Sequence, residues 1–414
     1  MANYKNEFPF FESNPGIAYL DNANTTQIHK SVLDAINAFY THFNYNIGRA
    51  GYKGARQMAQ IKEWAQLGAA KFLNAKKEQI IFTSGATEGL NLIASSFAYW
   101  GEKQNKKFKV LTTKLEHASL FLPWLDSKRA EFSFLKLNDD YTFNLDFFKE
   151  ELEKNLPDVV LLSSMTNTTG EVRPLEEIGK LCKQYGVVFI VDHAQGAAHV
   201  QIDVEKMNID FLAFSLHKMY GPKGLGVLFA KNPFFLKPSR VGGGMNKWFT
   251  ETDMEYQDSL DRFYAGTENL EALCGAVEIF NFFEENWGGI KSIELYFGTF
   301  MYKLLQKIPN IKIYSVPNST IFLFNIKDIE ALDIMNYLDR EDICIRAGNH
   351  CSKLTKELFG LSTCRVSLGV YNDENDLAAL YHALKKLTEE EICQKSVQEK
   401  QTAELKNVEQ MNAH

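Results

Sequence analysis

A lysine, Lys218, follows a strongly apolar run on a short turn. The run 211–214 leads into Ser215-Leu216-His217-Lys218, and another apolar run begins soon after Lys223. A lysine between two buried strands is poorly placed for solvent, and partial burial favours its neutral amine, which can form a Schiff base with a carbonyl group. Lys223 is expected to be an ordinary surface lysine.

A carboxylate, Asp192, stands at the end of another apolar run. It follows residues 187–191, and Gln195 comes three positions later. A carboxylate at the end of an apolar strand needs a cationic partner. A protonated pyridine nitrogen would be such a partner, and a helix cap or an ion pair with an arginine is the simpler alternative.

A glycine-containing turn with several hydroxyl groups follows the apolar run 80–82. The segment 83–89 reads Thr-Ser-Gly-Ala-Thr-Glu-Gly, and apolar residues then recur at helical spacing. Free backbone N–H groups and the positive end of a helix dipole at such a turn favour a phosphate. The alternative is that Ser84 and Thr87 only cap the helix.

These segments belong to a region in which strand-like runs alternate with amphipathic helical stretches. The alternation is typical of an α/β fold, a mainly parallel sheet that helices cover on both faces. Ligands bind outside the carboxyl ends of the strands in such sheets, where these polar residues lie. One helix is expected to start after Pro174 and end at Gly186, with Cys182 in the core. The strand-like runs are 80–82, 110–111, 159–162, 187–191, 211–214 and 227–229.

The second part of the chain predicts a smaller α+β domain. We expect helices at 270–283, 293–305, 329–338 and 374–387, with short strands at 311–314 and 320–324. The predicted organisation is an N-terminal segment, 1–20, near the small domain, a large domain, 21–265, the small domain, 266–387, and a polar tail, 388–414. The tail is expected to be a solvated helix or disordered.

The composition excludes several classes of function. The 414 residues are 45% hydrophobic and 23% charged, with a formal net charge of −7, so nothing indicates binding to nucleic acid or to an anionic membrane. No apolar run reaches the ~20 residues that span a bilayer, and no secretory signal is evident, so we expect the cytoplasm. The six cysteines have neither CxxC pairs nor metal-ligand spacing, so we expect no disulfide framework and no metal site.

Four motifs together identify a family. From about Tyr19 to Leu387 the sequence resembles the fold-type I enzymes that use pyridoxal 5'-phosphate (PLP), in the class V aminotransferase group, and within it the group II cysteine desulfurases. The motifs that carry the resemblance are Val191-Asp192-His193-Ala194-Gln195, Ser215-Leu216-His217-Lys218-Met219-Tyr220-Gly221-Pro222, Ala265-Gly266-Thr267 and Arg346-Ala347-Gly348-Asn349-His350-Cys351.

The resemblance assigns the contacts to PLP. It implies that Lys218 binds the cofactor as a Schiff base and later moves the substrate's Cα proton, while Asp192 pairs with the pyridinium nitrogen. His117 would stack on the pyridine face and act as an acid or base. Further contacts would come from Gln195 and Asn167 at the ring hydroxyl and from Ala86, Thr87, Ser215 and His217 at the phosphate.

The same resemblance implies a homodimer and a substrate clamp. Thr267 would reach the phosphate from a second subunit. Arg365, fourteen residues after Cys351, matches the arginine that binds the substrate α-carboxylate in a bidentate pair, with Asn167 and Arg346 as further substrate contacts. Two N-terminal segments that match the family at the entrance of the site are Gly48-Arg49 and Asp21-Asn22-Ala23.

Cys351 favours sulfur removal over the other reactions of this fold. Its thiolate would attack the sulfur of L-cysteine and leave a persulfide on the protein and alanine as the product, and Arg346 and His350 are expected to favour that thiolate. The alternative, a small buried cysteine, is disfavoured because its neighbours are polar. The short segment up to Arg365 implies that a sulfur-acceptor or scaffold protein, for iron–sulfur cluster or thiolation pathways, docks at the pocket.

Other functions stay open at this point. A selenocysteine lyase, or another PLP enzyme of the class V aminotransferase type in which Cys351 is incidental, would share most of these residues. A homologue without activity, and a metal hydrolase built on Asp192 and nearby histidines, are more remote. The sequence departs from the family pattern at three places: Asn349 replaces the first of two histidines, Asn24 replaces the second of two alanines, and Ser84 replaces an arginine.

Overall fold

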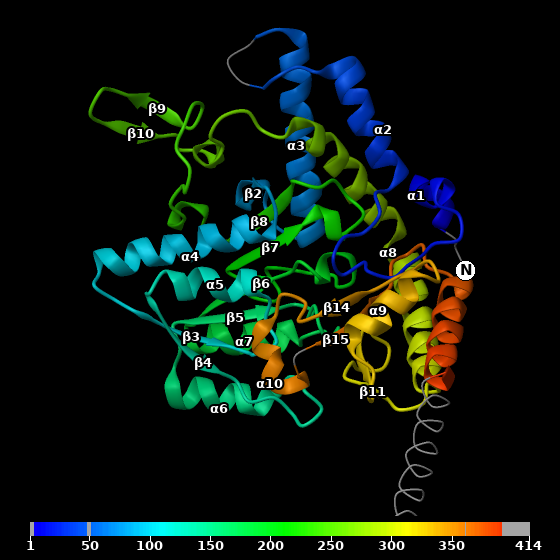
Figure 1. Ribbon diagram of the computed structural model, residues 1–414. Helices are drawn as coiled ribbons and strands as arrows, with labels where there is room; N and C mark the ends of the chain where they lie inside the picture. The colour runs from blue at the N-terminus through cyan, green and yellow to red at the C-terminus, as the bar shows by residue number, and fades with distance from the viewer. Residues whose placement is uncertain (1–3, 48–50, 361, 391–414) are drawn as a thin grey trace, which may run out of the picture.

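The computed structural model describes residues 4–47, 51–360 and 362–390 (Figure 1). Its largest sheet has seven strands in the order β2-β8-β7-β6-β5-β3-β4. The pairs among β4, β3, β5, β6 and β7 are parallel, and β8 is antiparallel to both β7 and β2. The strands are β2 (Ile80–Thr83), β3 (Phe108–Thr112), β4 (Ala130–Phe134), β5 (Val159–Ser163), β6 (Val188–Asp192), β7 (Phe211–Ser215) and β8 (Gly226–Ala230).

Helices cover both faces of this sheet, as predicted. Alternate residues of each strand enter two different cores: Leu161 and Ile190 pack with α4 and α5, whereas Leu162 and Val191 pack with α3, α6, α7 and α8. This alternation follows from the two-residue period of a strand. The helices are α3 (Lys53–Leu73), α4 (Ala86–Lys103), α5 (Ala118–Asp126), α6 (Leu145–Asn155), α7 (Leu175–Tyr185) and α8 (Leu270–Leu305).

A second, four-stranded antiparallel sheet has the order β11-β12-β15-β14. It packs with α9 (Ala331–Asp339) and with a helix that spans residues 374–390 of the described ranges. Figure 1 shows β14 and β15 next to the carboxyl ends of the large sheet. The strands are β11 (Ile311–Ile313), β12 (Ile321–Ile326), β14 (Arg346–Gly348) and β15 (Thr363–Ser367).

The N-terminal segment joins these two parts. The short strand β1 (Ala18–Tyr19) pairs in parallel with β13 (Ile343–Cys344), and Lys5 forms ion pairs with Asp373 and Asp376. The remaining helices are α1 (Pro9–Ser13), α2 (Lys30–Ala38) and α10 (Lys356–Phe359), and β9 (Asn246–Phe249) and β10 (Met254–Tyr256) form a hairpin.

The predicted fold class is confirmed, but the hairpin of β9 and β10 and the strands β14 and β15 were not predicted. The edge strand β4 was not predicted, and the two helices expected at 270–283 and 293–305 are one continuous helix, α8. The helix α7 ends at Gly186, which has φ 68°, and Cys182 is 1% exposed, both as predicted. The domain boundaries stay predictions, and residues 391–414 of the predicted tail lie outside the described residues.

Two further findings bear on the function classes. No helix of the described ranges is long and apolar enough to cross a membrane. Within those same ranges, His, Cys, Asp and Glu side chains form no group of three that could hold a metal ion.

Candidate active site

The carboxyl ends of β5, β6 and β7 meet at a cavity of about 240 Å³. Its other sides come from the first turns of α4 and α5, from residues 23–24, and from the segment 346–351 with Arg365. The structure therefore brings together most of the predicted site residues from distant parts of the sequence. Those that line the cavity are Ala86, Thr87, His117, Asn167, Asp192, Ser215, His217, Lys218, Arg346, Cys351 and Arg365.

Asp192 and Lys218 form the desolvated floor of the cavity. Asp192 is 4% exposed, and burial raises the pKa of its carboxyl to about 6. Its Oδ1 accepts a hydrogen bond from the Ala194 N–H at 2.9 Å, but within the described part of the chain it forms no ion pair. Burial lowers the pKa of Lys218 to about 8, against the opposing effect of Asp192. The floor therefore offers a carboxylate that lacks a cationic partner and an amine that is readily neutral.

His117 is neutral and has a defined tautomer. It is the N-cap of α5, and its Nδ1 accepts a hydrogen bond from the Ser119 N–H at 3.1 Å. Burial, followed by the positive charges of Lys218 and the two cavity arginines, lowers its pKa to about 4. Because Nδ1 is an acceptor, the ring proton lies on Nε2.

The first turn of α4 forms an anion-binding end of the cavity. The Ala86 N–H donates to Ser215 Oγ at 2.8 Å, while the N–H groups of Thr87 and Glu88 have no acceptor in the described part of the chain. These free donors add to the helix dipole, so they favour a phosphate. The turn packs tightly on β8, since a Cβ atom on Gly226 would lie 2.5 Å from the Cα atom of Gly85. Only glycine permits this approach.

The arginines Arg346 and Arg365 are directly paired residues of β14 and β15. Arg365 is 1% exposed, and burial lowers its pKa to about 10, so it is still cationic at neutral pH. Its Nη2 lies 3.2 Å from Asp21 Oδ1, and its Nη1 donates to the Asn167 carbonyl at 3.0 Å. Its Nε has no acceptor among the described residues. A buried guanidinium with a free N–H in a cavity wall can bind a carboxylate.

Cys351 is exposed at the cavity and is fixed by its backbone. Its carbonyl accepts from the Ala118 N–H at 2.9 Å, and its N–H donates to Asn349 Oδ1 at 3.2 Å. The φ angles of 53° at His350 and 59° at Cys351 lie in the left-handed region, which costs ~1–3 kcal/mol for each such residue. Arg346 Nη2 lies 3.5 Å from the Cys351 Sγ. The thiol is therefore held in a defined place beside a positive charge.

Asn167 connects this segment to the large sheet. Its Nδ2 donates to the His350 carbonyl at 2.8 Å, and its Oδ1 accepts from Ser352 Oγ at 3.0 Å. The side-chain amide of Asn167 is therefore used to hold the Cys351 segment, in addition to lining the cavity.

The expectation that His350 supplies positive charge to Cys351 is wrong. His350 is 3% exposed, and burial lowers its pKa to about 3, so the ring is neutral. Its Nε2 is bonded to the Thr363 carbonyl at 3.1 Å. Cys364, although next to Arg365, is fully buried, and its Sγ donates to the Ala331 carbonyl. The charge beside Cys351 therefore comes from Arg346.

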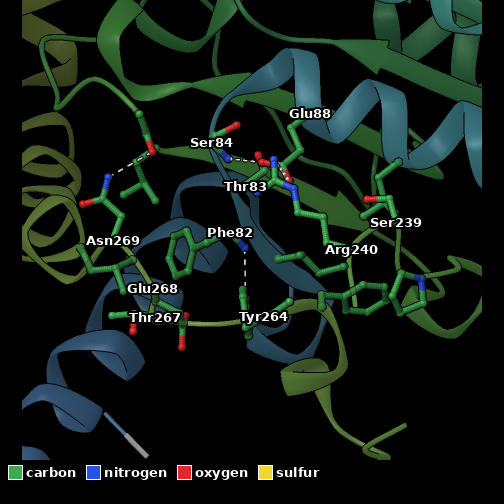
Figure 2. Close-up of a pocket in the computed structure, with 18 residues that line it drawn as sticks. Phe82, Thr83, Ser84, Glu88, Ser239, Arg240, Tyr264, Thr267, Glu268 and Asn269 are labelled. Atoms are coloured by element: carbon green, nitrogen blue, oxygen red, sulfur yellow. Dashed lines mark hydrogen bonds and ion pairs between the residues drawn. The ribbon is translucent and has the colours of Figure 1, made fainter. Parts of the chain in front are cut away.

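Two predicted residues lie outside the main cavity. Gln195 lines a small adjoining cavity with Asp192, and its Nε2 donates to the Ala23 carbonyl at 2.6 Å. Figure 2 shows Thr267 in a separate pocket together with Glu268, Asn269 and Arg240, and this pocket is also lined by Ser84 and Glu88 near the start of α4. Within one chain Thr267 does not reach the main cavity, so its predicted contact from a second subunit stays a prediction. Gly48 and Arg49 lie outside the described residues.

The sequence profile of the aminotransferase class-V family matches residues 18–380. The chain belongs to this family. Among its curated relatives, a probable cysteine desulfurase of Borreliella burgdorferi is 32% identical over 93% of this chain and 96% of its own length. One from Staphylococcus aureus strain Mu50 is 30% identical over 90% of this chain and 92% of its own length.

Solved structures place this class-V family member in the same fold. The apo cysteine desulfurase of Thermococcus onnurineus NA1 aligns with a TM-score of 0.88 and 26% identity over 94% of this chain and 99% of its own. The cysteine desulfurase CsdA of Escherichia coli, in an S-sulfonic acid form, aligns with a TM-score of 0.84 and 27% identity over 92% of this chain and 97% of its own. The predicted family and the fold-type I architecture are confirmed.

Several residues of this class-V site were not predicted. Ser119 lines the cavity, and its hydroxyl lies 2.8 Å from that of Thr87. Glu116, which is buried, accepts from the Ser163 N–H at 2.8 Å and so holds the turn that carries His117. A hydroxyl two residues after His117, itself a predicted site residue, was a usable sign for Ser119. Nothing local marks Glu116, whose partner lies 47 residues away.

Proposed function

We propose that this chain is a PLP-dependent cysteine desulfurase that converts L-cysteine to L-alanine and holds the sulfur as a persulfide on Cys351. The observation that carries the proposal is the exposed Cys351 Sγ beside Arg346, in the same cavity as Lys218 and Asp192. A transaminating enzyme needs the lysine and the carboxylate but has no use for such a thiol. The names of the relatives support the same reaction.

The cavity has the groups that PLP requires. Lys218 would hold the cofactor covalently, and Asp192, which is buried without an ion pair in the described part of the chain, would face its ring nitrogen. The free N–H groups at the start of α4, with Thr87, Ser215 and His217, would hold its phosphate. When bound, PLP supplies an electron sink that stabilises negative charge on the substrate.

Two arginines bind and orient the substrate in this proposal. Arg365 binds the α-carboxylate of L-cysteine through the N–H groups that protein acceptors leave free, and it is fixed for this task by Asp21 and by the Asn167 carbonyl. Arg346 lies directly opposite Arg365 on the neighbouring strand and adds positive charge to the same wall of the cavity.

The protons are moved by Lys218 and His117. The lowered pKa of Lys218 makes its Nζ a competent base for the substrate Cα proton near neutral pH. His117 is neutral and acts as an acid only after it takes up a proton; because its pKa is lowered to about 4, the protonated ring gives that proton up readily.

Sulfur moves by attack of the Cys351 thiolate on the substrate sulfur. An S–S bond forms and the substrate C–S bond breaks, and the electron pair of the broken bond stays on carbon. A proton at that carbon completes the methyl group of alanine. The sum is L-cysteine plus the Cys351 thiol giving L-alanine plus the Cys351 persulfide, with no external oxidant or reductant.

Release of the sulfur needs a partner. Because the Cys351 backbone is bonded to Ala118 and Asn349, the persulfide has little reach. An acceptor protein would therefore bring a thiolate to the cavity, attack the outer sulfur and release the Cys351 thiolate. We further propose a homodimer in which Thr267 contacts the phosphate of the neighbouring subunit, as the resemblance implies.

The test is the absorption spectrum of the purified protein together with an assay for alanine. We expect a visible Schiff-base band, alanine formation from L-cysteine without an amino acceptor, and loss of turnover in Cys351→Ala with the band retained. A fully active Cys351→Ala protein would make the cysteine incidental and favour an aminotransferase. A protein that is colourless after incubation with PLP would overturn the assignment of Lys218.

A further inference from the structure

The two cavity arginines carry like charges at directly paired positions, so they repel each other. Arg346 and Arg365 are opposite each other in the β14–β15 register, and like charges in that arrangement are destabilising. Within the described residues, a single carboxylate, Asp21, forms an ion pair with either of them, and it does so with Arg365. Arg346 needs another partner if it is to stay in the cavity.

That partner is Asn24. Its Oδ1 accepts a hydrogen bond from Arg346 Nη1 at 3.1 Å, and its Nδ2 donates to Asp21 Oδ2 at 3.0 Å. Asp21 thus binds Arg365 through one oxygen and, through the amide of Asn24, supports Arg346 with the other. The second guanidinium nitrogen of Arg346, Nη2, is the one beside Cys351 Sγ.

The turn that carries Asn24 is fixed in place. The Asn24 N–H donates to the Asp21 carbonyl at 3.1 Å, and Asp21 forms a parallel bridge with Ser367. The Ala23 N–H donates to Ser367 Oγ at 2.8 Å, and Asn22 Nδ2 donates to the Ser367 carbonyl at 2.7 Å. Asn24 therefore acts from a rigid base at the end of β15.

We propose that Asn24 is a positioning residue that holds the Arg346 guanidinium against the sulfur of Cys351. Without the amide, the half-buried Arg346 side chain would be repelled by Arg365 and would gain rotamer freedom, so it would leave the thiol. This role adds a residue that positions Arg346 at the reactive thiol, and it rests on the proposed function of that thiol.

A purely local role for Asn24 predicts something different. An asparagine that only stabilises its turn would affect folding without changing the reactivity of Cys351. Reactivity depends on the fraction of thiolate. The charged groups that line the same cavity are Arg346, Arg365, Lys218 and Asp192, and the histidines His117, His217 and His350 are neutral. Of these groups in the described part of the chain, Arg346 alone is bonded directly to Asn24.

The experiment is alkylation of Cys351 in the holoenzyme by iodoacetamide across a pH series, read by mass spectrometry of the Cys351 peptide. We expect Asn24→Ala to slow alkylation near neutral pH by ~3-fold or more and to shift its pH midpoint upward, with the same plateau at high pH, because less thiolate is present. Asn155→Ala is the matched control, since Asn155 is also exposed and donates to a carboxylate, that of Glu151, at 2.6 Å.

A double-mutant cycle decides whether Asn24 acts through Arg346. Arg346→Ala should reproduce the effect, and Asn24→Ala should add nothing in that background. Asn24→Ser, which can still support the turn but is too short to reach Arg346, should behave like Asn24→Ala. An unchanged pH profile in Asn24→Ala, or an equal effect in the Arg346→Ala background, would overturn the proposal. The alkylation rate reports the reactivity of the Cys351 thiol whether or not the protein forms alanine. Failure of the desulfurase assignment would therefore be detected by the alanine assay and not by this experiment.

Discussion

The floor and the rim of the cavity are built on different principles. Asp192 and Lys218, on the floor, end or follow strands of the large sheet, and their pKa values are shifted mainly by burial. Cys351 and Arg346, on the rim, are more exposed and are placed by hydrogen bonds and left-handed backbone rather than by apolar packing. We infer that the residues of the floor determine which cofactor chemistry is possible, while the residues of the rim determine which reaction follows.

The largest expected effect comes from breaking the floor. Lys218→Ala removes the amine that would hold the cofactor and move the Cα proton, so alanine formation should fall by at least ~10²–10⁴-fold. The Schiff-base absorption band should be lost as well. Lys223→Ala, a nearby exposed lysine, is the control and should leave both the band and the rate unchanged. Retention of the band in Lys218→Ala would place the cofactor on another residue.

A rim substitution should separate substrate binding from cofactor binding. Arg365→Lys loses the bidentate geometry for the substrate carboxylate, so we expect KM for L-cysteine to rise by ~10-fold or more while the absorption band stays. Arg346→Lys should raise KM less, because Arg346 faces the thiol. Steady-state kinetics of the two variants give the comparison. A larger increase for Arg346→Lys would reverse the two roles.

The smallest expected effect concerns stability. His350 supports the rim as a buried neutral ring, and its pKa is lowered to about 3. The unfolded chain binds this proton near pH 6.5 and the folded protein does not, so stability is lost as pH falls below that value, by ~1–2 kcal/mol at pH 5. In His350→Gln, the drop in melting temperature between pH 7 and pH 5 should shrink. His382→Gln, at an exposed histidine, should leave it unchanged, and equal drops in all three proteins would contradict the account.

The floor could be predicted from the sequence because strand ends are visible locally. Asp192 and Lys218 each follow an apolar run, and the carboxyl ends of neighbouring strands meet at one edge of the sheet. The edge strand β4 was missed because all of its residues are partly or fully exposed and its sequence has no apolar run.

The rim could not be predicted in this way. The pairing of Arg346 with Asn24 joins residues 322 positions apart, and the opposition of Arg346 and Arg365 depends on strand register. The continuity of α8 was also not predicted, and the stretch between the two expected helices contains Gly288 and Gly289. Gly289 allows close approach of the N-terminal segment, since a Cβ there would lie 2.8 Å from the Tyr4 hydroxyl. Contacts that depend on tertiary structure leave no local pattern.

The most direct test of the central claim is to locate the sulfur after one turnover. The holoenzyme is mixed with L-cysteine without an acceptor thiol. The amount of alanine is then determined, and the masses of the cysteine-containing peptides are measured by mass spectrometry. The account predicts one added sulfur atom on the Cys351 peptide for each alanine formed, no added sulfur on the Cys364 peptide, and an unchanged result in Cys364→Ser. Alanine formed with no sulfur on Cys351 would contradict it.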